Sequence, residues 1–239
     1  MRKEGTSLFS LFVIRKGSVN LSTKKVHTAW AFATAAVVVP CVAVMPIEAA
    51  TMPFIDIKNS GSEAELYKAV SELYGQGIVF GTTSTTFSPY QNLTRGEAAY
   101  FLAEALKLET KNVVNPGFSD VPASHKYYGH IAALAEKGII QKGTTFNPDH
   151  FIKRSQMAKM LTIGFDLQQA TTLSAPFLDF TKENETNMYI QTLLNYGITQ
   201  GTSATTFSPY TDVRRGQMVL FLYRTLQKTK DDFYIISVE

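Results

Sequence analysis

The sequence of 239 residues contains one cysteine, one tryptophan and four histidines. None of the histidines lies at a metal-ligand spacing from a cysteine or from a second histidine: His125 and His130 are five residues apart, and His150 is isolated. The sequence also lacks a nucleophile-elbow serine and a phosphate-binding glycine loop. It therefore predicts a protein that is not an enzyme and that has no metal site and no cofactor.

Residues 1–50 differ in kind from the rest of the chain. Two lysines at 24–25 precede an apolar stretch over 29–47, which ends in small residues at 49–50. This order is typical of a secretory signal peptide, and we expect cleavage after Ala49 or Ala50. A membrane anchor is the alternative, but two prolines interrupt the apolar stretch. Because Cys41 lies in the leader, we expect a secreted mature chain without cysteine and without an integral membrane span.

The net charge of +3 comes from this leader. Residues 1–50 hold six of the 23 Lys and Arg residues and two of the 20 Asp and Glu residues, so 17 basic and 18 acidic residues remain. A nucleic-acid-binding domain needs a clustered basic surface. The near-neutral balance therefore predicts no nucleic-acid partner.

What the remaining chain has in abundance is an internal repeat with a period near 60 residues. Each copy contains Phe-x-Asp, then Gly-Ile, a second glycine, Phe-x-Pro, and an arginine six residues after that proline. We divide the chain into units 1 (51–110), 2 (111–170) and 3 (171–230), followed by a tail (231–239). The landmarks are Phe54/Asp56, Phe118/Asp120 and Phe177/Asp179; Gly81, Gly143 and Gly201; and Arg95, Arg154 and Arg215.

Two helical patterns occur in each unit, which predicts an all-α, mainly helical protein. The first helices are expected over 63–76, 125–137 and 185–196, and each second helix is expected to begin at the repeated arginine. Ser62 with Glu65, and Thr94 with Glu97, have the spacing of capping boxes. Units 2 and 3 lack the capping threonine before their second helix, so these helix starts should be weaker. Repeated units of this size share one core with their neighbours.

The aspartate of each Phe-x-Asp motif has two interpretations. It could act as a general acid or a cation ligand. Its repetition beside a phenylalanine favours a structural role instead, as a turn or cap residue that fixes the entry to the first helix.

The repeated arginine is the stronger candidate for ligand binding. At the first turn of a helix, unpaired amides and the helix dipole attract anions, and a guanidinium adds a planar fork that suits carboxylates. The alternative is an ion pair between neighbouring units. On the ligand-binding interpretation, alanine at each arginine should weaken binding with little effect on the melting temperature, and Arg95 should matter most.

These residues and their order resemble the S-layer homology family, over about residues 52–230. The resemblance implies a pseudo-three-fold single assembly whose inter-unit grooves bind anionic, often pyruvylated, secondary cell-wall polysaccharide. It places Arg95, Arg154 and Arg215, with Gly81, Gly143 and Gly201, at these grooves. Gly96 replaces the usual alanine after Arg95, and Asn187 replaces the usual aromatic residue of the first helix in unit 3. The loop of unit 2 is two residues shorter than the loops of the other units. These departures predict unequal grooves.

The resemblance implies a non-catalytic module that attaches to polysaccharide and peptidoglycan of a bacterial wall. Two alternatives remain open at this point. The units could pack against other surface-layer proteins, or the chain could be a truncated tether of a wall-active enzyme.

Overall fold

The computed structural model describes residues 12–15, 52–180, 184–230 and 233–236. Residues 51–230 form one compact unit, the repeat domain. A second unit contains a pair of antiparallel strands, β1 (Phe12–Arg15) and β2 (Phe233–Ile236). The predicted cleavage site after residue 49 or 50 lies outside the described residues.

The described part of the repeat domain holds two α-helices from each unit, which confirms the mainly helical fold class. Unit 1 forms α1 (Ala64–Gly75) and α2 (Arg95–Ala105), unit 2 forms α3 (Tyr128–Glu136) and α4 (Arg154–Gly164), and unit 3 forms α5 (Glu185–Asn195) and α6 (Arg215–Lys230). The three second helices begin at the repeated arginine, as the sequence predicts.

The capping box predicted at Ser62 and Glu65 is wrong. A 3-10 turn, η1 (Gly61–Glu63), precedes α1, and the residue that caps the helix makes no side-chain hydrogen bond to it. The carboxylate of Glu63 instead accepts from the amide of Lys58, while Glu65 pairs with Arg224 of unit 3. These acids therefore hold a loop and a neighbouring unit.

The capping box at Thr94 and Glu97 is confirmed, with both reciprocal hydrogen bonds present. At the starts of α4 and α6, one of the two capping-box hydrogen bonds remains: the glutamine side chain accepts from the backbone amide three residues earlier. The weaker helix starts that the sequence predicts for units 2 and 3 stay a prediction.

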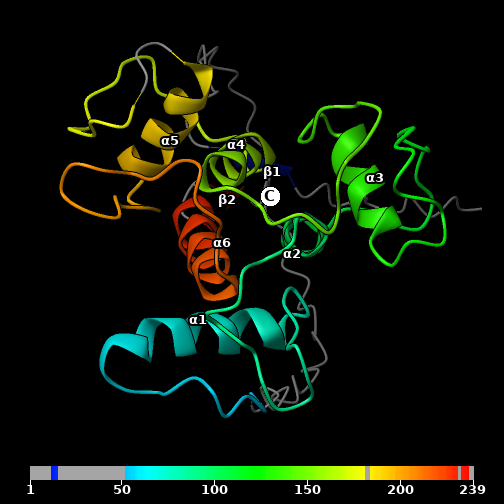
Figure 1. Ribbon diagram of the computed structural model, residues 1–239, viewed down its shortest axis with the longest axis horizontal. Coiled ribbons are helices and arrows are strands. Elements are labelled where there is room, and N and C mark those ends of the chain that lie inside the picture. Colours follow the sequence, from blue (N-terminus) through cyan, green and yellow to red (C-terminus); the bar gives the residue numbers. More distant parts are fainter. Residues whose placement is uncertain (1–11, 16–51, 181–183, 231–232, 237–239) are drawn as a thin grey trace, which may run out of the picture. The chain divides into compact units, whose positions relative to one another are not determined.

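The second helices of the three units lie together in the middle of the repeat domain, and the first helices lie around them (Figure 1). Helices α2, α4 and α6 contact one another, while α3 packs on α2, α5 on α4 and α1 on α6. Each outer helix therefore covers the inner helix of the preceding unit, and unit 1 closes the series on unit 3. The pseudo-three-fold relation between the units stays a prediction.

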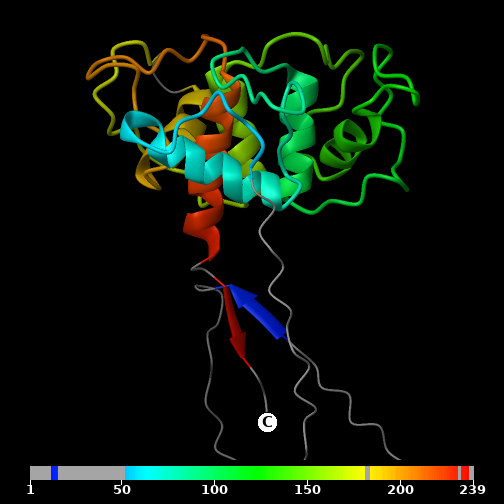
Figure 2. The same ribbon diagram turned by 90° about the horizontal axis from the view of Figure 1, so that it is seen from below.

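A closed set of backbone hydrogen bonds joins the three loops before the inner helices. The amide of Leu93 donates to Val213, that of Val213 to Ile152, and that of Ile152 back to Leu93, at 2.8, 2.9 and 3.0 Å. All three side chains are fully buried. The loops gather at one end of the helices (Figure 2), so every unit is tied to both others there.

The aspartates of Phe-x-Asp hold the Phe-x-Pro loop of their own unit, rather than the entry to the first helix. The carboxylate of Asp56 accepts from the amides of Phe87 and Ser88 at 2.9 and 2.7 Å, and Asp120 and Asp179 do the same in units 2 and 3. Ser88 has a φ of 58°, a left-handed conformation that is unfavourable for residues other than glycine. The carboxylate therefore stabilises a strained loop.

We predict that Asp56→Ala lowers the free energy of unfolding by about 2 kcal/mol, because two loop amides lose their acceptor. Chemical denaturation measures this change. Ser88→Gly in the same background should recover part of the loss by relieving the backbone strain. Asp149→Ala, at an exposed loop position, is the control; an equal loss there would contradict the assignment.

Candidate functional site: three inter-unit grooves

The three repeated arginines extend from their helix starts onto the Phe-x-Pro loop of another unit. Nε of Arg95 donates to the carbonyl of Phe146 in unit 2, at 2.9 Å. Arg154 reaches Phe207 in unit 3 in the same way, and Arg215 reaches Phe87 in unit 1. Each guanidinium also lies over the ring of that phenylalanine, at 4.3 to 4.8 Å from the centroid, a favourable cation–π geometry. The arginines thus join the units in closed order.

The amides at the starts of the inner helices are also used by these loops. The amides of Arg95 and Gly96 donate to the carbonyls of His150 and Pro148, both at 2.8 Å, and the starts of α4 and α6 show the same pattern. The sequence-based expectation that unpaired amides attract an anion is therefore wrong at these positions. The neighbouring loop already supplies the acceptors that a helix start requires.

The guanidinium of Arg215 is fully enclosed by the protein. Besides Phe87 it donates to the carbonyl of Phe80, and it forms an ion pair with Glu97 at 2.8 Å. Its side chain is 0% exposed. Burial lowers the pKa of Arg215, and the Glu97 carboxylate opposes that shift. This arginine fits the alternative interpretation, an ion pair between units.

Arg154 is intermediate between the other two. It is buried, and it donates to the carbonyls of Phe207 and Gln200. Gln217 occupies the helix position that Glu97 has in unit 1. Burial lowers the pKa of Arg154, with Asp179 acting in the opposite direction.

Arg95 is the arginine most open to a ligand. Its side chain is only partly buried, and within the described residues its one hydrogen bond is the contact from Nε to Phe146. Unit 2 has one more residue between its two glycines, at 138 and 143, than the other units have. The carbonyl contact that Phe80 and Gln200 provide elsewhere has no counterpart on Arg95. Its remaining N–H groups are therefore available.

A cavity of about 220 Å³ lies beside Arg95, and we call it the Arg95 groove. Its polar side includes Gln156 and Lys159, and its apolar wall includes Ile139 and Met160; the remaining lining residues are Ile140, Gln141, Thr145 and Phe146. Burial lowers the pKa of Arg95, and the nearby Asp120 carboxylate opposes that shift. Two cations thus border a groove whose lining contains no carboxylate.

Lys159 and Gln156 were missed by the sequence reasoning. Lys159 stands five residues after the arginine, where the other units have Tyr100 and Leu220. The sequence signal that could have identified Lys159 was a difference between the repeats rather than a motif that they share.

The three loop glycines occupy different surroundings. A Cβ on Gly81 would come within 2.3 Å of the Phe54 ring, and one on Gly201 within 2.5 Å of Phe177, whereas Gly143 faces open space. Gly81 and Gly201 thus let the Phe-x-Asp ring pack against its own loop. Contact of these glycines with a ligand stays a prediction.

Within the described residues, no group of three His, Cys, Asp or Glu side chains could hold a metal ion. A search of the same residues finds no helix that is both long and apolar enough to cross a membrane.

The family model described as "S-layer homology domain" matches residues 53–99, 117–158 and 187–219, one segment in each unit. The chain belongs to the S-layer homology family. Membership of this family and the similarity to surface-layer proteins indicate a secreted protein attached at the cell wall. The resemblance drawn from the repeat landmarks is therefore confirmed.

Three relatives match most of this chain. The "Surface-layer 125 kDa protein" of Lysinibacillus sphaericus is 32% identical over 202 residues, which cover 82% of this chain and 17% of that protein. The "S-layer protein" of Bacillus thuringiensis subsp. finitimus is 29% identical, covering 76% and 22%. The "Endoglucanase" of Bacillus sp. (strain KSM-635) is 26% identical, covering 78% and 20%. This chain spans about a fifth of their length.

We predict that the three arginines contribute unequally to stability. Arg215→Ala should lower the free energy of unfolding by about 3 kcal/mol or more, because it leaves the partly buried Glu97 carboxylate unpaired. Arg95→Ala should cost about 1 kcal/mol, the net contribution of one hydrogen bond. Chemical denaturation of both variants tests the difference, and equal losses would contradict the burial-based ranking.

Proposed function

We propose that the chain is a non-catalytic module that attaches to the bacterial wall by binding an anionic group of secondary wall polysaccharide in the Arg95 groove. A carboxylate such as that of a pyruvate ketal is the chemical group that suits it. The observation that carries the proposal is that the partly exposed Arg95 guanidinium and Lys159 line the same groove, beside an apolar wall. We expect the module also to contact peptidoglycan and other surface-layer proteins at the wall.

The recognition chemistry follows from the two cations. A guanidinium fork binds both oxygens of a carboxylate, and Lys159 adds charge without a fixed direction. Ile139 and Met160 provide apolar surface for the carbon skeleton of the ligand. Partial burial strengthens these charged hydrogen bonds relative to a fully exposed pair.

At the contact between units 3 and 1, the repeated arginine is already neutralised by the protein itself. Glu97 gives Arg215 the carboxylate that an acidic ligand would otherwise supply. Units 2 and 3 carry the uncharged Gln156 and Gln217 at the same position. We therefore assign the anion to the Arg95 groove rather than to three equal sites.

The decisive variant is Gln156→Glu, which introduces into the Arg95 groove the acid found at position 97. The change keeps the acceptor for the Lys153 amide, so the helix start should persist. We expect at least about a tenfold loss in affinity for purified sacculi, because the new carboxylate competes for Arg95. Gln217→Glu is the matched control and should bind like the parent.

Sedimentation with sacculi, before and after chemical removal of the secondary polysaccharide, gives the readout. Arg95→Ala should bind weakly, and Arg95→Lys should recover only part of the affinity, since lysine keeps the charge but lacks the fork. If Gln156→Glu binds like the parent, the site assignment is wrong. If stripped sacculi retain the protein equally well, the polysaccharide is not the ligand, and packing against surface-layer proteins is favoured.

A further inference from the structure

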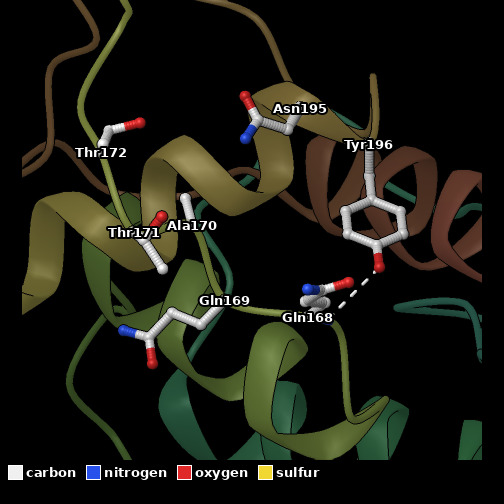
Figure 3. Close-up of a pocket in the computed structure, with 7 residues that line it drawn as sticks. All are labelled: Gln168, Gln169, Ala170, Thr171, Thr172, Asn195 and Tyr196. Carbon is white, nitrogen blue, oxygen red and sulfur yellow. Dashed lines mark hydrogen bonds between the residues drawn. The ribbon is translucent and has the colours of Figure 1, made fainter.

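A second cavity lies between units 2 and 3, away from the arginines. After α4 the chain crosses the C-terminal end of α5, and the space between them has a volume of about 340 Å³. We call it the linker pocket. Figure 3 shows its two sides: residues 168–172 of the linker, and Asn195 and Tyr196 at the end of α5.

Buried polar side chains of α5 fix the linker in place. Thr192, which is fully buried, accepts from the amide of Ala170 at 2.9 Å. Gln191, also buried, accepts from two further linker amides, at 174 and 175, and donates to Oδ1 of Asn195 at 2.8 Å. The Asn195 oxygen therefore has a partner within the protein, while its exposed amide N–H groups border the pocket.

The aromatic ring of Tyr196 closes one side of the pocket. Its hydroxyl accepts from the backbone amide of Gln168 at 3.3 Å, the contact drawn in Figure 3. The ring is partly exposed, so it presents an apolar surface next to the polar groups. Walls of this kind are preformed, because hydrogen bonds from the linker hold them without a ligand.

This arrangement is specific to unit 3. In unit 2 the positions of Gln191 and Thr192 are taken by Ala132 and Ala133. The corresponding cavity between units 1 and 2 is lined by charged side chains of both signs: Lys107, Glu109, Glu136 and Lys137. The linker pocket is lined by glutamine, asparagine, threonine, alanine and tyrosine side chains, none of them charged.

The chemistry of the lining selects an uncharged polar ligand. Without a charged side chain, the pocket offers no ion pair to an anion or a cation. Amides and hydroxyls can both donate and accept, as the hydroxyl and acetamido groups of a sugar require. Polar groups beside one aromatic surface are typical of small-ligand sites.

We propose that the linker pocket is a second carbohydrate site, which binds an uncharged hexopyranose residue such as an N-acetylhexosamine. It lies beyond the C-terminal end of α4, whereas Arg154 stands at its start. Eleven residues of helix separate them, about 16 Å at 1.5 Å per residue. The pocket therefore adds a contact to neutral wall glycan that does not use the arginines.

Tri-N-acetylchitotriose is a suitable neutral probe, and NMR of ¹⁵N-labelled protein is the measurement. We expect saturable shifts of the side-chain amide signals of Gln168, Gln169 and Asn195, at millimolar affinity typical of a shallow site. Asn195→Asp keeps the acceptor for Gln191 but removes the amide donor, so affinity should fall about tenfold. Glu136→Gln, the matched position in unit 2, should leave binding unchanged.

Absence of saturable shifts at these amides, or equal affinity of Asn195→Asp and the parent, would overturn the proposal. If Asn195→Asp fails to fold, Gln169→Ala replaces it, because that amide is exposed, and the same loss is expected. Gln156→Glu should bind the neutral probe like the parent. That control separates failure of the linker pocket from failure of the Arg95 groove.

Discussion

The contact between a helix-start arginine and the Phe-x-Pro loop of another unit is the interaction on which the repeat domain depends. One side chain satisfies the loop carbonyl and covers the phenylalanine ring, and the adjacent helix amides donate to the same loop. A single two-helix unit cannot bury both of its faces. Three such contacts in closed order, together with the triangle of Leu93, Ile152 and Val213, make each unit part of its neighbours' core.

The same contact is compatible with the ligand role that we propose for Arg95. Three identical joints would give equal grooves, but two small differences separate them. Glu97 forms an ion pair with Arg215, whereas Arg95 lacks the second carbonyl contact that Arg154 and Arg215 make. We therefore expect the largest contribution to stability at the joint between the first and last units, and we propose anion binding at the joint between the first two.

Much of the fold could be predicted from the sequence because its signals are local and repeated. The inner helices begin at the arginine, and the Thr94 capping box is present. The function of the Phe-x-Asp carboxylate could not be located, because its amide partners lie 26 to 32 residues away. The Ser62 box failed for a related reason: Glu65 is used by Arg224, 159 residues along the chain. Long-range partners override a local pattern.

The candidate site was predictable only in part. The repeats identify Arg95, Arg154 and Arg215 as equivalent, and equivalence hides the burial that distinguishes them. Lys159 and the polar residues of α5 carry no repeated signal, since each differs from its counterparts. Gln156 recurs in unit 3 as Gln217, so by itself it does not mark a distinct groove. A tandem-repeat sequence predicts the shared scaffold well. The differences between its sites come from positions at which the repeats carry different residues.

The central claim is that the grooves share one scaffold but that the Arg95 groove binds the anion. The most direct test follows the arginine Nε–H signals of ¹⁵N-labelled protein by NMR while a pyruvylated N-acetylhexosamine is added. The account predicts a saturable shift of the Arg95 signal and a stationary Arg215 signal. Equal shifts of all three arginines, or a shift of Arg215 without Arg95, would contradict it.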